Sequence, residues 1–195
     1  MAPRRAAGSG AQQLDDADAG EWREVAPPRR PALSPAEELD DALARCYRHL
    51  GEREHSAAEL RRRLERARLG GEAIDAAIAT VTQQGHLDDA RYARLLAEDR
   101  RNIDGWGVER IRARLQAAGI ERELIDSVLA GHDAPSELVA AGALLRRRCR
   151  GRLRDDRERQ RAFAILIRAG YDSSVAYDAI RSVGGEAWGD GPPEP

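Results

Sequence analysis

Apolar residues recur at helical spacing along most of the chain, and three of them, Leu64, Leu115 and Leu166, lie 51 residues apart. Two further columns keep this interval: Leu60, Ile111 and Ala162, and Ile74, Ile125 and Ala176. Such a period is typical of a repeated unit that is too small to bury its apolar face alone. The pattern therefore predicts three tandem copies of one helical unit between about residues 34 and 183.

Each unit is predicted to hold a leading helix, a middle helix and a trailing helix. In the first unit, Ser34 with Glu37 and Ser56 with Glu59 have the spacing of capping boxes, which predicts that helices begin there. Two acidic pairs also stand where a helix is predicted to begin, and a carboxylate there satisfies free backbone amides. We interpret these pairs, Asp88-Asp89 and Asp155-Asp156, as caps rather than as catalytic or metal-binding acids.

Glycines are predicted to end the middle helices, because a residue without a side chain adopts the left-handed conformation of a helix end most easily. The pattern assigns this role to Gly70-Gly71, Gly119 and Gly170 in turn. Residues 102–107, with two glycines around a tryptophan, are expected to form a sharp loop in the second unit.

No segment alternates between apolar and polar residues as a strand does, so the predicted fold is all-α. We expect three tandem three-helix repeats that resemble helix-turn-helix units and form an elongated, curved array. The predicted repeats span residues 34–86, 87–132 and 133–183. The tails, residues 1–33 and 184–195, have no apolar periodicity and are expected to be disordered.

Composition narrows the possible functions. The 195 residues include 34 acidic and 32 basic side chains, all of the latter arginine, so the net charge of −2 argues against a uniformly basic nucleic-acid binder. There is no Gly-rich phosphate loop, nucleophile elbow or zinc spacing, so we expect no enzymatic activity, cofactor or metal. Cys46 and Cys149 are expected to be small buried thiols, and the histidines to have surface or cap roles. The absence of a long apolar run predicts a cytoplasmic protein.

Arginines are the candidate binding residues. Each middle helix carries a pair four residues apart and off the apolar stripe, and these pairs are Arg62 and Arg66, Arg110 and Arg114, and Arg157 and Arg161. Two guanidinium groups on one helix face repel each other unless an anion or an acidic partner lies nearby. The alternative is a solvated face that neighbouring acids on the same helix neutralise, as Glu59 could neutralise Arg63.

Residues 146–154 contain six arginines among nine residues: Arg146, Arg147, Arg148, Arg150, Arg152 and Arg154. Between residues 137 and 168, ten arginines face only four acids. A phosphate backbone or an acidic protein groove would balance this charge, and binding to nucleic acid would weaken steeply with salt. Four of the eight aromatic residues, Tyr47, Tyr92, Phe163 and Tyr177, fall on predicted core faces, so base stacking is not indicated.

Several motifs together resemble those of a known family. They are, in chain order, HSAAEL at 55–60 with Leu64, GHLDDARYA at 85–93, Gly107 with Arg110-Ile111 and Leu115, and Gly119-Ile120. Their order and spacing are similar to the consecutive signatures of the RecX family over residues 39–183. The third unit diverges most, and its arginine run is not part of this pattern.

The resemblance implies a regulator, not an enzyme, whose partner is the RecA recombinase; the absence of a long apolar heptad seam separately favours a monomer. It implies three three-helix repeats that lie along the groove of the RecA filament on single-stranded DNA and hinder its extension, ATP hydrolysis, strand exchange and SOS co-protease activity. The arginines are then expected to contact acidic RecA surfaces, DNA phosphates or both. The alternatives are a direct DNA-binding protein that acts without RecA and a purely structural helical adaptor.

Overall fold

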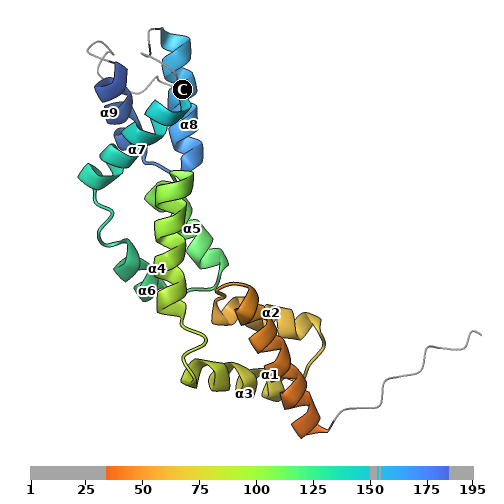
Figure 1. The fold of residues 1–195 in the computed structure, drawn as a ribbon. Coiled ribbons are helices and arrows are strands. Elements are labelled where there is room, and N and C mark those ends of the chain that lie inside the picture. Colours follow the sequence, from red (N-terminus) through yellow and green to blue (C-terminus); the bar gives the residue numbers. More distant parts are fainter. Residues whose placement is uncertain (1–33, 150–152, 154, 185–195) are drawn as a thin grey trace, which may run out of the picture. The chain divides into compact units, whose positions relative to one another are not determined.

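The computed structural model describes residues 34–149, 153 and 155–184. Every regular element among these residues is helical, which confirms the all-α prediction (Figure 1). The elements are α1 (Pro35–Glu52), α2 (Ala57–Arg66), α3 (Gly71–Gln83), α4 (Asp89–Asp99), the π-helical turn η1 (Arg100–Asp104), α5 (Val108–Ala117), α6 (Arg122–Leu129), α7 (Ala134–Arg148), α8 (Asp156–Ala169) and α9 (Ser173–Gly184). None of these helices is long and apolar enough to cross a membrane.

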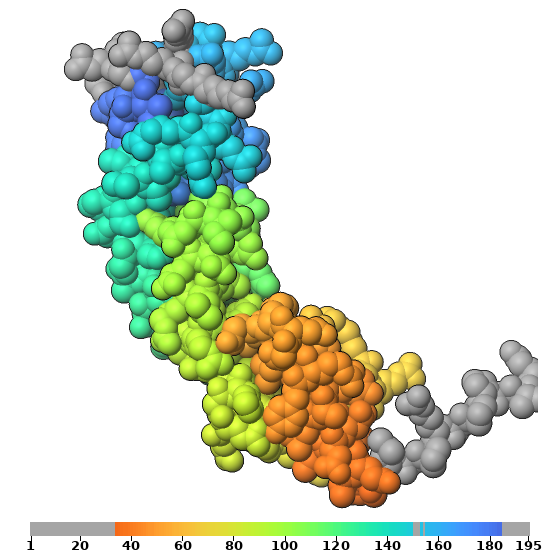
Figure 2. Space-filling model, in the orientation of Figure 1, coloured from red at the N-terminus to blue at the C-terminus, as the bar shows by residue number. Residues whose placement is uncertain are grey.

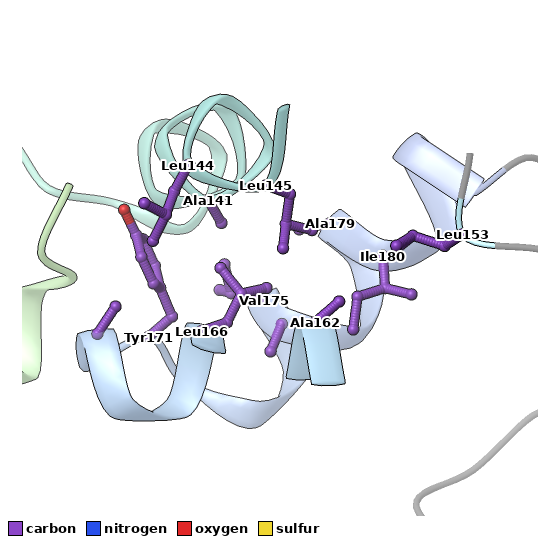
Figure 3. Close-up of a cluster of buried hydrophobic side chains, with 12 residues drawn as sticks. Ala141, Leu144, Leu145, Leu153, Ala162, Leu166, Tyr171, Val175, Ala179 and Ile180 are labelled. Atoms are coloured by element: carbon purple, nitrogen blue, oxygen red, sulfur yellow. The ribbon is translucent and has the colours of Figure 1, made fainter. Parts of the chain in front are cut away.

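The helices form three successive groups, each with its own apolar core (Figure 1). In each group the leading helix packs on the trailing one: α1 on α3, α4 on α6 and α7 on α9. Figure 3 shows the core of the third group, where Leu144, Leu166 and Val175 come from three different helices and point toward one another. On the face shown in Figure 2, α1, α4 and α7 lie at the surface.

The 51-residue interval holds in the packing as well as in the sequence. All nine residues of the three apolar columns are at most 1% exposed. The middle helices α2 and α5 begin 51 residues apart, and so do α3, α6 and α9. The leading helices are less regular, because their lengths differ: 18, 11 and 15 residues. The repeat is therefore strictest in the middle and trailing helices, which supply the columns.

The predicted end of the first middle helix is wrong. Gly119 and Gly170 do have positive φ angles, +80° and +88°, at the ends of α5 and α8. The equivalent position in the first repeat is Arg68, whose φ is +62°, while Gly70 and Gly71 lie at the start of α3. All three repeats therefore have a left-handed turn at this position. The first repeat keeps the turn although its residue is not glycine and a side chain there has a steric cost.

The predicted loop at 102–107 is also partly wrong. Residues 100–104 continue α4 as a π-helical turn, in which Arg100 and Asp104 pair at 2.6 Å. Gly105, with φ +71°, then ends the helix. A π-helical turn is rare and widens the backbone by one residue per turn. It leaves Trp106 directly before α5.

The predicted caps are largely confirmed. Ser34 forms a complete capping box with Glu37, and Asp88 and Asp155 cap α4 and α8 through backbone amides three residues on. Asp89 has a different role, because its carboxylate accepts a 2.8 Å hydrogen bond from the amide of Ala57, at the start of α2. Asp89 therefore caps a helix of the preceding repeat.

Other side-chain predictions are also partly confirmed and partly wrong. Cys46 is buried and Cys149 half-buried, and both thiols are free. Tyr92 is buried as expected, but Tyr47 is 41% exposed because it lies at the edge of α1, where its hydroxyl donates to Gln84. His55 is fully buried, which overturns the expected surface role.

Candidate functional site: arginines and the repeat junctions

The first junction is the contact between α2 and the second repeat. The Ser56 hydroxyl, which also caps α2, donates a 2.6 Å hydrogen bond to the backbone carbonyl of Ala118. The backbones approach so closely that a Cβ on Gly119 would lie 2.4 Å from the Cβ of Ala58. The start of one middle helix thus packs directly on the end of the next.

A carboxylate, Glu59, is the centre of this first junction. It accepts hydrogen bonds of 3.2 Å from Arg53, from the Tyr92 hydroxyl and from Arg114, and it lies 3.2 Å from Nδ1 of His55. Burial raises the pKa of Glu59, but hydrogen bonds from Arg114 and His55 and the charge of Arg53 outweigh it, so its pKa lies below the usual value. The predicted capping box is half formed, because Ser56 accepts from the Glu59 amide but the Glu59 carboxylate contacts these other groups. The alternative in which Glu59 neutralises Arg63 is not supported, since none of the contacts of this carboxylate with the residues that the structure describes is with Arg63.

His55 reinforces this arrangement. Burial, and after it the nearby charge of Arg53, lowers the pKa of His55. The imidazole is therefore neutral near pH 7, with Nδ1 placed to donate to the Glu59 carboxylate. The first junction accordingly balances its charges with groups from its own chain.

The second junction repeats this contact one interval later, with a backbone amide in place of the Ser56 hydroxyl. Gly107 donates its amide to the carbonyl of Ala169 at 2.8 Å, and these residues follow Ser56 and Ala118 by 51 positions. A Cβ on Gly107 would lie 2.4 Å from the carbonyl oxygen of Gly170, and one on Gly170 would lie 2.4 Å from the Cβ of Arg110. Both glycines are required by this close approach.

A different buried carboxylate serves the second junction. Glu137, only 4% exposed, pairs with Arg101 and accepts a 3.0 Å hydrogen bond from the amide of Val108, which caps α5 from α7. Nearby, the Tyr171 hydroxyl donates to the carbonyl of Gly105 at 3.2 Å. Burial, with a further contribution from the charge of Glu137, raises the pKa of Tyr171 to about 12.

Four of the predicted site arginines hold the repeats together. Arg62 donates to the carbonyl of Ala117, Arg110 to that of Arg168 and Arg147 to that of Ile103, while Arg114 pairs with Glu59. These partners belong to a different repeat in every case. The sequence pattern did identify arginines with a distinct role, but for these four residues that role is to bind other repeats of the same chain.

Five predicted arginines are exposed and have no hydrogen bond or ion pair with any of the residues that the structure describes: Arg66, Arg146, Arg148, Arg157 and Arg161. Acids that could balance them are used elsewhere, since Asp155 caps α8 and Asp156 pairs with Arg159. The remaining candidates, Arg150, Arg152 and Arg154, lie outside the described residues. The five guanidinium groups are thus exposed without a partner among the described residues.

A pocket of about 410 Å³ lies at the second junction, among η1, α5, α7 and α8. It is lined by Asp104, Trp106, Arg110, Leu144, Arg148, Ile165, Arg168 and Ala169. The sequence analysis did not single out Trp106 or Arg168 as site residues. The register could have found them, because they follow His55 and Ala117 of the first junction by 51 positions.

The fold defines a class: proteins built of tandem three-helix repeats. A model of the second three-helix domain of RecX matches residues 88–129. Proteins named "Regulatory protein RecX" match as well: 32% identity in Mycolicibacterium vanbaalenii, over 69% of this chain and 78% of that protein, and 36% in Trichlorobacter lovleyi, over 67% and 90%. The chain belongs to the RecX family.

Further comparisons agree with this assignment. The relative in Deinococcus radiodurans is 36% identical over 70% of this chain, and the match spans 65% of that protein, slightly less than two thirds of its length. Crystal structures of RecX proteins share the fold. One has a TM-score of 0.63 at 24% identity, over 76% of this chain and 73% of the other, and RecX from Lactobacillus salivarius has 0.64 at 14%, over 76% and 97%.

Proposed function

We propose that this protein regulates the RecA recombinase, mainly as an inhibitor. It binds the groove of the RecA filament on single-stranded DNA and limits filament growth, ATP hydrolysis, strand exchange and SOS co-protease activity. Membership of a family whose proteins are named as regulators is the observation that carries this proposal. A protein with this role acts in the cytoplasm, where the chromosome lies.

The described surface supports action by binding. Repeats whose cores are separate but whose junctions are closely packed can hold arginines at fixed intervals, and a filament presents its subunits at fixed intervals too. The five exposed arginines without partners are the residues proposed to contact RecA or DNA, together with those of 150–154 that lie outside the described residues. We propose that one monomer binds several filament subunits.

A second candidate, a DNA-binding protein that acts without RecA, is supported by the same cations. Guanidinium groups bind phosphate as well as carboxylate, so charge alone does not choose between the partners. The two functions differ in what the protein needs for tight binding. A filament regulator prefers RecA-coated DNA, whereas a direct binder has high affinity for naked DNA that falls steeply with salt.

The experiment titrates the full chain into the single-stranded-DNA-dependent ATPase of RecA. We expect inhibition well below one protein per RecA molecule, because a filament regulator blocks extension from few sites. The test variant replaces Arg66, Arg146, Arg157 and Arg161 with Gln and should need several-fold more protein for the same inhibition.

The matched control removes four other exposed arginines, Arg48, Arg94, Arg122 and Arg181, and should inhibit like the wild type. Absence of inhibition by the wild type would contradict the proposed function. If tight binding to naked DNA accompanied that absence, the second candidate would take its place.

A further inference from the structure

The pocket at the second junction carries an excess of positive charge. Arg110, Arg148 and Arg168 line it, against a single acid, Asp104. That acid is already paired with Arg100 at 2.6 Å. The three guanidinium groups come from α5, α7 and α8, so they reach one cavity from three different helices.

The wall of this pocket is held in place by contacts within the chain. Arg110 lies over the Trp106 ring, with its Cζ 4.1 Å from the ring centroid, and donates a 3.0 Å hydrogen bond to the carbonyl of Arg168. Arg100 also approaches the ring, at 5.1 Å. A cation held over an aromatic ring keeps its charge while losing mobility. The pocket is therefore both charged and partly preorganised.

At the equivalent position of the first junction, an acid of the chain itself balances the positive charge. Glu59 stands 51 residues before Arg110, and His55 stands 51 residues before Trp106. At the first junction the acid meets two arginines, so the charges are satisfied internally. At the second junction Glu137 is fully engaged by Arg101 and the Val108 amide, and it does not line the pocket. The second junction thus lacks, at this position, the anion that the first junction has.

We propose that this pocket binds a backbone phosphate of single-stranded DNA. A phosphodiester is tetrahedral and offers acceptor oxygens in several directions, which suits guanidinium groups arriving from three helices better than a planar carboxylate does. Because Arg110 covers the Trp106 ring, the site reads charge rather than the stacked base, so binding is independent of sequence. The proposal deepens the proposed function, on which it rests for the source of the DNA.

The test uses Arg148 and Arg168, since neither side chain donates a hydrogen bond to the residues that the structure describes. The full-length Arg148→Gln/Arg168→Gln variant is compared with the wild type by fluorescence anisotropy on a labelled oligo(dT), over a series of salt concentrations. We expect its affinity at low salt to fall at least several-fold. The plot of log affinity against log salt should become shallower by about 0.7 for each phosphate that the variant no longer neutralises.

Two controls isolate the pocket. Arg48→Gln/Arg94→Gln removes the same charge from exposed faces of α1 and α4 and should leave affinity and slope close to those of the wild type. Arg148→Lys/Arg168→Lys keeps the charge without the planar fork, so it should keep most of the salt slope. Circular dichroism should show that all variants retain their helicity.

The outcomes that overturn the proposal are distinct. Unchanged affinity and slope in the Gln variant, or an equal loss in the Arg48 and Arg94 control, would remove the pocket as a phosphate site, as would failure of the wild type to bind oligo(dT). If the Gln variant bound DNA normally but lost inhibition of the RecA ATPase, the pocket would take an acidic protein group. Failure of the proposed function looks different: the wild type would not inhibit RecA, although the Gln variant would still bind DNA less tightly.

Discussion

The two junctions between repeats make the same contact between helices and differ in how their charges are balanced. Both place the start of one middle helix against the end of the next, through Ser56 and Ala118 at the first and through Gly107 and Ala169 at the second. Around this common contact, the first junction is neutralised by its own acid and the second leaves a cationic pocket open. The repeat thus fixes where the helices meet, while the side chains around the contact are free to take different roles.

This difference follows from how the two kinds of contact are made. A backbone approach tolerates few residues, because any Cβ at Gly107 or Gly170 would overlap a neighbouring atom. A polar network tolerates many, provided that each buried charge finds a partner. One junction can therefore serve stability alone, while the other holds the repeats together and also offers a site.

The largest effect is expected from Gly170→Ala at the second junction. The new Cβ would meet the Arg110 backbone at 2.6 Å, and alanine would also have to adopt a φ of +88°. Overpacking and left-handed strain together should lower the free energy of unfolding by about 2–5 kcal/mol. Urea unfolding followed by circular dichroism measures this change.

The matched control is Gly85→Ala, where φ is +75° but no atom lies within 4 Å of the added Cβ. It should cost only about 1 kcal/mol, the strain alone. Equal losses in the two variants would show that the close approach at the second junction contributes nothing to stability.

At the first junction, Glu59→Gln should lower the free energy of unfolding by about 2 kcal/mol, because it leaves Arg53 and Arg114 without their carboxylate. Glu123→Gln, on the exposed face of α6, is the control and should change it by less than about 0.5 kcal/mol. The measurement is again urea unfolding at neutral pH. A Glu59→Gln variant as stable as its control would mean that the first junction is not held by its charge network.

Much of this fold could be predicted from the sequence, because the apolar columns specify it locally. The interval of 51 residues located the middle and trailing helices, since Leu64, Leu115 and Leu166 are buried in the same way in each repeat. The end of the first middle helix was misplaced because Arg68 adopts a conformation that favours glycine. A residue pattern does not show a left-handed turn at a residue other than glycine.

The candidate site could be predicted only in part. Arginine spacing singled out Arg110 and Arg114, but it could not show that Arg114 meets Glu59, 55 residues earlier in the chain. Nor could it show that Arg168 shares a pocket with Trp106. Such pairs are contacts between repeats. A sequence shows which residues are neighbours on one helix, but it does not show which residues meet across two repeats.

The first junction is also expected to lose stability in acid. Burial lowers the pKa of His55, so the folded protein favours the neutral imidazole, while the unfolded chain takes up a proton near pH 6.5. Its contribution to stability is complete above that pH and is lost as pH falls toward the lower folded pKa. Glu59, whose pKa is also lowered, loses its contribution at still lower pH.

The corresponding measurement is the free energy of unfolding between pH 7 and pH 5 for the wild type and for His55→Asn. The wild type should lose stability over this range, and the variant should lose less because the buried imidazole is gone. Burial, and after it the charge of Arg101, also lowers the pKa of His132, which adds a loss that both proteins share. Identical pH dependence in the two proteins would show that His55 does not titrate on unfolding.

A smaller effect than that of Gly170→Ala is expected from Tyr171→Phe at the second junction. This change removes the 3.2 Å hydrogen bond from the buried hydroxyl to the carbonyl of Gly105 and keeps the packing of the ring. The net value of one such bond is about 1 kcal/mol, and the unpaired carbonyl of Gly105 adds to the loss. Tyr47→Phe is the control, because its hydroxyl bonds Gln84 on an exposed face and water replaces that bond. Thermal or urea unfolding should therefore separate the two variants, and equal stabilities would mean that water reaches the Gly105 carbonyl at the second junction.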